Sequence, residues 1–133
     1  MNSNLFRIIL FLTLTVVPAG GSLHAQCSQP TQEQEVIIRE AENDRYITRR
    51  VEFIGHRYTR DEVLRRRINI GLQEGEFFTR RNLLRSLQNV SKLKQIYPVK
   101  MRHVELHLNR SELTIDVTIC LQPTERRSRK RSR

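Results

Sequence analysis

The chain of 133 residues carries 24 Lys and Arg against 14 Asp and Glu, which gives a formal charge of +10 with its four His neutral. This length supplies one domain, and a hydrophobic fraction of 38% suits one small core but is low for a membrane protein. With five Gly and four Pro, the chain is neither collagen-like nor of low complexity. A large multidomain enzyme and a repeat array are therefore excluded.

The first 25 residues have the pattern of an export signal. Arg7 precedes the apolar run Ile8–Val17, and Ala25 offers a cleavage point before Gln26. The run is about half of the ~20 residues that span a bilayer, so a retained anchor helix is the weaker alternative. In either case we expect the domain to lie outside the cytoplasm.

Two cysteines remain after the expected signal, Cys27 and Cys120. In an oxidising compartment an even count predicts one possible disulfide, which would stabilise so small a domain by about 4 kcal/mol in the chain-entropy model. Lipidation at Cys27 is a minority alternative, because Gln26 stands where a lipoprotein signal has a small residue. Two free thiols are the third possibility.

Charge divides the mature chain into three segments. Residues 26–47 carry a net charge of −3, residues 48–123 of +7 and residues 124–133 of +5. The first segment is rich in Gln and is expected to be an exposed lead, although Glu35–Ala41 could form a short strand or a helical turn. The last segment has nothing apolar to bury, so we expect a disordered tail.

The middle segment begins with a strand pattern and continues with two helix patterns. Arg50–Ile54 has the alternation of a half-buried strand that ends at Gly55. Thr59 and Glu62 have the spacing of a capping box, and Thr79 can cap a second helix. The expected inward residues of the two helices are Val63, Leu64 and Ile68, followed by Leu83, Leu84, Leu87, Val90 and Leu93.

The rest of this segment has the pattern of a β-hairpin. Apolar residues alternate with polar ones up to Asn109, and the alternation resumes after the turn from Leu113 to Leu121. The opposite face is mostly polar and includes Cys120, which an N-terminal segment carrying Cys27 could reach. The predicted fold is α+β in the order β-α-α-β-β, with two helices on one face of a small three-stranded mixed sheet.

This order resembles the POTRA domain, a periplasmic module of outer-membrane barrel-assembly and two-partner-secretion proteins that also occurs singly in a bacterial division protein. The resemblance covers about residues 49–122, and the stretches that carry it are Val51–His56, Tyr58–Leu64, Glu74–Thr79 and Leu113–Ile119. Two departures limit it. The segment Lys94–Val99 lacks the usual Gly-containing turn, and no series of alternating strands is long enough for a membrane barrel, so barrel insertion is not carried over.

What the resemblance implies is a binding role at the cell envelope. An exposed edge strand would pair with an extended segment of a partner, such as an envelope or outer-membrane protein, in the periplasm or at the outer membrane. The implied edge is Met101–Leu108, and a merely solvated strand is the alternative for any single residue. The candidate partner-binding residues are Met101, His103, Glu105 and His107.

Enzyme chemistry is not indicated by any motif. The two His of His103–His107 would lie ~13 Å apart on a strand, too far to share one zinc ion. No Gly-rich phosphate loop, nucleophile elbow or paired Cys motif is present. We therefore expect a non-enzymatic protein without a metal or cofactor.

The basic tail supports an alternative function of a different class. Clustered Lys and Arg release counterions when they neutralise phosphates, so the tail could bind an anionic lipid surface. Nucleic acid is the less expected target because of the export signal. The residues concerned are Arg126, Arg127, Arg129, Lys130, Arg131 and Arg133.

Overall fold

The computed structural model describes residue 27, residues 29–57 and residues 59–124. The expected signal peptide and the basic residues of the tail lie outside these described residues. Within them, no helix combines the length and the apolar character that crossing a membrane requires. In chain order, the elements are α1 (Thr31–Asn43), β1 (Ile47–Ile54), α2 (Asp61–Ile68), α3 (Arg80–Val90), the 3₁₀ turn Met101–His103, β2 (Val104–Asn109) and β3 (Thr114–Cys120).

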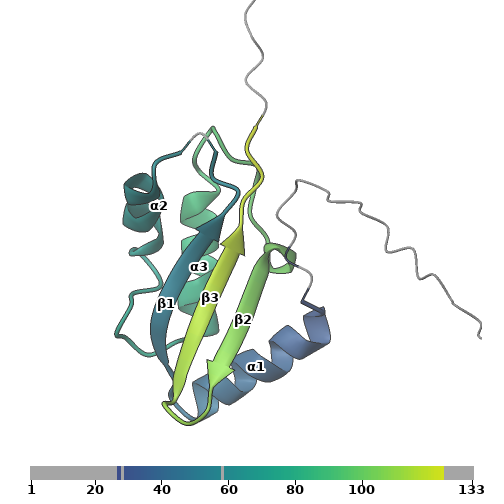
Figure 1. Ribbon diagram of the computed structural model, residues 1–133, viewed down its shortest axis with the longest axis vertical. Helices are drawn as coiled ribbons and strands as arrows, with labels where there is room; N and C mark the ends of the chain where they lie inside the picture. Colours follow the sequence, from purple (N-terminus) through teal and green to yellow (C-terminus); the bar gives the residue numbers. More distant parts are fainter. Residues whose placement is uncertain (1–26, 28, 58, 125–133) are drawn as a thin grey trace, which may run out of the picture.

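The strands form one mixed sheet with β3 in the middle (Figure 1). β1 runs parallel to β3, and β2 pairs with β3 in the antiparallel direction. The register of β1 shifts between Thr48 and Arg50, where a residue is left out of the pairing. The predicted α+β fold, with α2 and α3 on one face of a three-stranded mixed sheet, is confirmed.

Alternation along the strands sends one row of apolar side chains into a single core. The strand residues in this core are Val51, Phe53, Val104, Leu106, Ile115, Val117 and Ile119. From the helices come Leu64 and Ile68, followed by Leu83, Leu87 and Val90. The prediction that Val63 and Leu84 point inward is wrong, because both side chains are about two-fifths exposed.

The two predicted helix caps had different outcomes. The Thr79 hydroxyl accepts a hydrogen bond from the Asn82 amide at 3.1 Å, so this cap is confirmed. The predicted capping box at Thr59 is wrong, because α2 begins at Asp61 and makes no side-chain cap hydrogen bond. Asp61 instead accepts from the Arg65 Nε at 2.6 Å, one helical turn further on.

The segment expected as an exposed lead contains a docked helix, which corrects that expectation. α1 buries Gln34, Ile38 and Ala41, whose spacing of three and four residues places them on one helix face. Both apolar residues belong to the core, and α1 contacts β2. Glu35 of α1 also binds the Arg80 guanidinium of α3 through both carboxylate oxygens. The composition of this segment predicted exposure to solvent, because a polar residue, Gln34, occupies one of the three buried positions of α1.

The hairpin turn lies where the sequence predicted it, between Asn109 and Thr114. Asn109 stabilises the turn by accepting from the Glu112 amide at 3.2 Å and from the Ser111 hydroxyl at 2.7 Å. Leu113, expected as the first inward residue of the last strand, instead has a φ of 53° and is 48% exposed. The strand therefore begins one residue later than its apolar pattern does.

Candidate functional site at the edge of β2

β2 is an outer strand of the sheet, and among the described residues β3 is its only neighbouring strand. Its side chains alternate, so Val104 and Leu106 enter the core while Glu105 and His107 lie on the opposite, open face. In an antiparallel pair, alternate residues direct both main-chain groups away from the neighbouring strand. The N–H and the carbonyl of Leu106 both point away from β3, because both bind Gln29. Leu108, two residues further along, has the same orientation.

A single side-chain amide covers the main-chain groups of Leu106. The Gln29 Oε1 accepts from the Leu106 N–H at 2.8 Å, and the Gln29 Nε2 donates to the Leu106 carbonyl at 2.9 Å. These are the two hydrogen bonds that the main chain of an added strand would make. The edge is therefore capped at Leu106 by the chain's own N-terminal segment.

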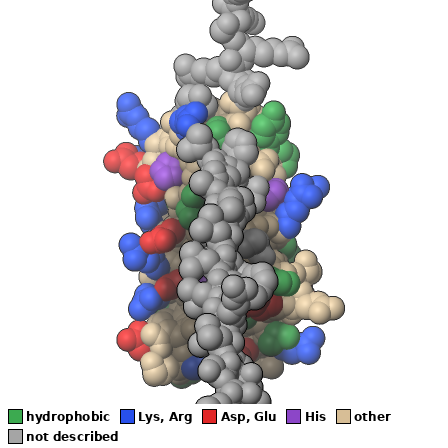
Figure 2. All heavy atoms as spheres, turned by 45° about the vertical axis from the view of Figure 1, so that its right-hand side comes forward, with side chains coloured by type: hydrophobic (Ala, Val, Ile, Leu, Met, Phe, Trp, Pro, Cys, Tyr) green, Lys and Arg blue, Asp and Glu red, His purple; other side chains and the backbone are tan. Residues whose placement is uncertain are grey.

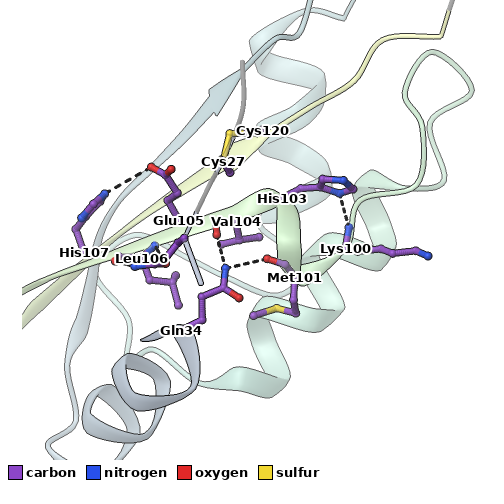
Figure 3. The surroundings of a disulfide bond; sticks show 11 residues. Cys27, Gln34, Lys100, Met101, His103, Val104, Glu105, Leu106, His107 and Cys120 are labelled. Carbon is purple, nitrogen blue, oxygen red and sulfur yellow. Dashed lines mark hydrogen bonds and ion pairs between the residues drawn. A yellow bond between two sulfur atoms is a disulfide. The ribbon is translucent and has the colours of Figure 1, made fainter. Parts of the chain in front are cut away.

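A second glutamine covers the start of the strand. Gln34 of α1 is 2% exposed, and its Nε2 donates to the Met101 carbonyl at 2.9 Å and also to the Val104 carbonyl (Figure 3). The Val104 N–H donates to the Met101 carbonyl. The Met101 carbonyl and both main-chain groups of Val104 are thus occupied within the described part of the molecule.

The predicted edge strand is too long at its N-terminal end, which corrects the site. Met101–His103 form a 3₁₀ turn, in which the His103 Nδ1 accepts from the Lys100 N–H at 3.0 Å. Burial, with the nearby charges of Arg102 and Lys100, lowers the pKa of His103. An alternating pattern does not reveal such a turn, because the three residues of the turn run directly into the strand at Val104.

Two of the four candidate residues remain side by side. The Glu105 carboxylate lies 3.8 Å from the His107 Nε2 on the open face (Figure 3). Met101 and His103 lie in the turn and do not join them. The structure therefore divides the predicted set into a strand pair and a turn pair.

Cys27 and Cys120 form a disulfide whose Cα atoms are 5.8 Å apart. Cys120 ends β3 and is 6% exposed, whereas Cys27 is partly exposed. The bond fixes the start of the described chain beside the β2 edge (Figure 3). Neither Gln29 nor Gln34 was predicted as a site residue, although both belong to the Gln-rich composition of the lead.

Charges on the open face are paired rather than gathered by sign. Arg49 binds Asp116 through Nε at 3.0 Å, and hydrogen bonding to Arg49 lowers the pKa of Asp116. Arg50 pairs with Glu52 at 2.8 Å. In the part of Figure 2 that grey atoms leave uncovered, basic and acidic side chains lie interspersed. The predicted anion-binding residues of the tail lie beyond the described residues.

Comparison with known proteins gives one family match. The family described as POTRA, surface antigen variable number repeat, matches residues 46–122, which are 77 of the 133 residues. The match spans β1 through β3 and includes the β2 edge. No curated protein matches the chain.

Proposed function

The chain belongs to the POTRA family, and from this premise we propose that it is an exported protein-binding module of the bacterial envelope that pairs its β2 edge with an extended segment of a partner. Domains of this family are protein-interaction modules of the periplasm and the outer membrane. The context proposed here is outer-membrane protein assembly or another envelope complex. The partners would be envelope or outer-membrane proteins that present an extended segment.

The observation that carries this proposal is that the N–H and the carbonyl of Leu106 are both hydrogen-bonded to the Gln29 side chain. An outer strand normally offers its main-chain groups to water or to another strand. Here one glutamine amide takes the place of a strand residue, within 2.9 Å of both groups. Leu106 is therefore aligned for strand pairing, and a partner would replace one amide with a continuous ladder.

The corrected bounds of the site also indicate which residue pattern the partner segment would have. It would pair with Leu106–Asn109 rather than with the whole of Met101–Leu108, because Gln34 and the 3₁₀ turn occupy the beginning of that range. A segment added there continues the two faces of the sheet, so its apolar residues would extend the core side and its polar residues would lie beside Glu105 and His107. An extended segment of alternating apolar and polar residues fits this edge.

Site-specific photo-crosslinking in envelope fractions tests whether the partner binds at the β2 edge. We would place a crosslinking amino acid at His107, beside the edge, and at Arg66, on the exposed side of α2, as the matched control. Adducts that form at position 107 and not at position 66 support the proposal. Equal yields at the two positions contradict it.

A proline substitution then tests whether main-chain pairing is involved. Leu108→Pro removes an N–H that points off the sheet and leaves the ladder to β3 intact, whereas Leu108→Ala keeps this N–H and removes a similar amount of side chain. The crosslinked partner should be lost with the Pro variant and retained with the Ala variant. If both variants retain it, the partner does not use the main chain of β2.

A further inference from the structure

The N-terminal segment passes around the edge of β2 from one face of the sheet to the other. Cys27, Gln29 and Pro30, called the strap below, start at the disulfide to Cys120 on the open face and lead into α1. Ile38 of α1 belongs to the core on the opposite face. In Figure 3 the disulfide lies on one side of β2 and Gln34 on the other.

Both ends of the strap are anchored, and only its middle covers the edge. Two hydrogen bonds between neutral groups hold Gln29 to Leu106, and such bonds contribute little net stability because water can replace them. The anchors raise the effective concentration of the Gln29 amide at the edge without adding a contact there. The cap therefore depends on both anchors, of which the disulfide is the one that a reductant can release.

We propose that the Cys27–Cys120 disulfide is a latch on the β2 edge, and that a dithiol reductant opens the edge by releasing the strap. This inference rests on the proposed function, because it assigns a regulation to the same pairing site. A thiolate of the reductant attacks the disulfide and forms a mixed disulfide, while one cysteine leaves as a thiolate and takes up a proton. The second thiol of the reductant then displaces the other cysteine, so two electrons reduce the bond and the reductant ends as a disulfide.

The opening is local. Ile38 and Ala41 remain buried after reduction and keep α1 against β2, and Gln34 continues to occupy the Val104 carbonyl. What becomes available is the main chain of Leu106, next to that of Leu108. These two residues direct four main-chain groups off the sheet, which is a short but complete site for an antiparallel segment.

Rapid exchange of amide protons with water, measured by NMR on the millisecond scale, tests the latch. We would compare the oxidised protein, the protein reduced with dithiothreitol and the oxidised Gln29→Ala variant. Gln32→Ala is the matched control, because the Gln32 side chain lies on the exposed side of α1 and makes no hydrogen bond among the described residues. The exchange rate of the Leu106 amide should rise about tenfold in the reduced protein and in Gln29→Ala, and not in Gln32→Ala.

Two other amides show whether the change is local. The Ile38 amide lies inside α1 and should stay too slow to detect in every sample. The Leu108 amide lies beyond the strap and should exchange rapidly in every sample. If reduction leaves the Leu106 amide protected, or exposes Ile38 together with it, the latch is disproved.

A peptide with the sequence of Val104–Asn109 separates this inference from the proposed function. If the edge pairs with extended segments, this peptide should shift the Leu106 and Leu108 amide signals of the reduced protein and leave those of the oxidised protein in place. Rapid exchange at Leu106 without peptide shifts in either form upholds the latch and contradicts edge pairing. Equal shifts in both forms uphold edge pairing and overturn the latch.

Discussion

Glu40 of α1 and Arg110 of the β2–β3 turn form an ion pair through two hydrogen bonds, of 2.7 Å from Nε and 2.9 Å from Nη2. The Tyr46 hydroxyl donates to the same carboxylate at 3.1 Å. Glu40 thus joins the N-terminal helix to the hairpin at the end of the sheet opposite the disulfide. Hydrogen bonding to Arg110, and less strongly to Tyr46, lowers the pKa of Glu40 below its ordinary value.

The lowered pKa of Glu40 predicts a pH-dependent contribution to stability. A carboxylate with a lower pKa in the folded state stabilises fully above its unfolded pKa, and this contribution disappears as the pH falls through the folded pKa. Glu40→Gln should therefore lower the urea midpoint at pH 7, and the difference from wild type should vanish at low pH.

The matched control for Glu40 is Glu62→Gln, because the Glu62 side chain makes no ion pair or hydrogen bond among the described residues. Its urea midpoint should stay close to that of the wild type at every pH from 7 to 3. A Glu40→Gln difference that stays constant over this range would contradict the role assigned to the ion pair.

Ser86 connects the end of α2 to α3 through a buried hydroxyl. It donates to the Ile68 carbonyl at 2.8 Å and accepts from the Leu72 N–H at 2.7 Å. Ser86→Ala should lower the free energy of unfolding by about 1–3 kcal/mol, because it leaves the buried Leu72 N–H without its partner and removes one of the two hydrogen bonds to the Ile68 carbonyl, which keeps the Gly71 N–H. Urea unfolding measures this loss, and Ser111→Ala in the exposed turn should change the free energy by less than about 0.5 kcal/mol. Equal losses in the two variants would show that the Ser86 hydroxyl does not stabilise the connection between α2 and α3.

Gly71 allows α3 to approach the end of α2. A Cβ atom at this position would lie 2.3 Å from the Asn82 carbonyl oxygen and 2.9 Å from the Ser86 N. Gly71→Ala should cost about 3 kcal/mol in urea unfolding, because the main chain of α3 must move. Gly75→Ala is the comparison, because position 75 has open space around it and a φ of +89°, so only backbone strain of about 1 kcal/mol applies. If Gly75→Ala lowers the free energy of unfolding more than Gly71→Ala does, the close approach of α3 does not require a glycine at position 71.

The disulfide should contribute strongly to stability as well as to capping. It closes a loop with a sequence separation of 93 residues, for which the chain-entropy model gives about 4–5 kcal/mol. Reduction should therefore shift the urea midpoint downwards, and Cys27→Ser in oxidising conditions should match the reduced wild type. A midpoint that is insensitive to reduction would show that the unfolded state is not restricted by this bond.

The sequence by itself determined the elements whose side chains repeat with a strong period. Alternation placed the hairpin and its turn, and the three- and four-residue steps of Leu83, Leu87 and Val90 placed α3. These patterns are local, because a strand or helix must present one apolar face to a core wherever that core lies. The α+β fold followed from the order of these elements, and the family followed from the resemblance of this order and its residue stretches to the POTRA domain.

Only the tertiary structure decided what covers the edge. α1 buries a Gln beside two apolar residues, so its period is too weak to predict that it docks on β2. The pairing of Gln29 with Leu106 joins residues 77 positions apart, and no local preference specifies such a contact. Strand pairing depends on main-chain groups that every residue carries, so composition and periodicity do not reveal which of them are already taken.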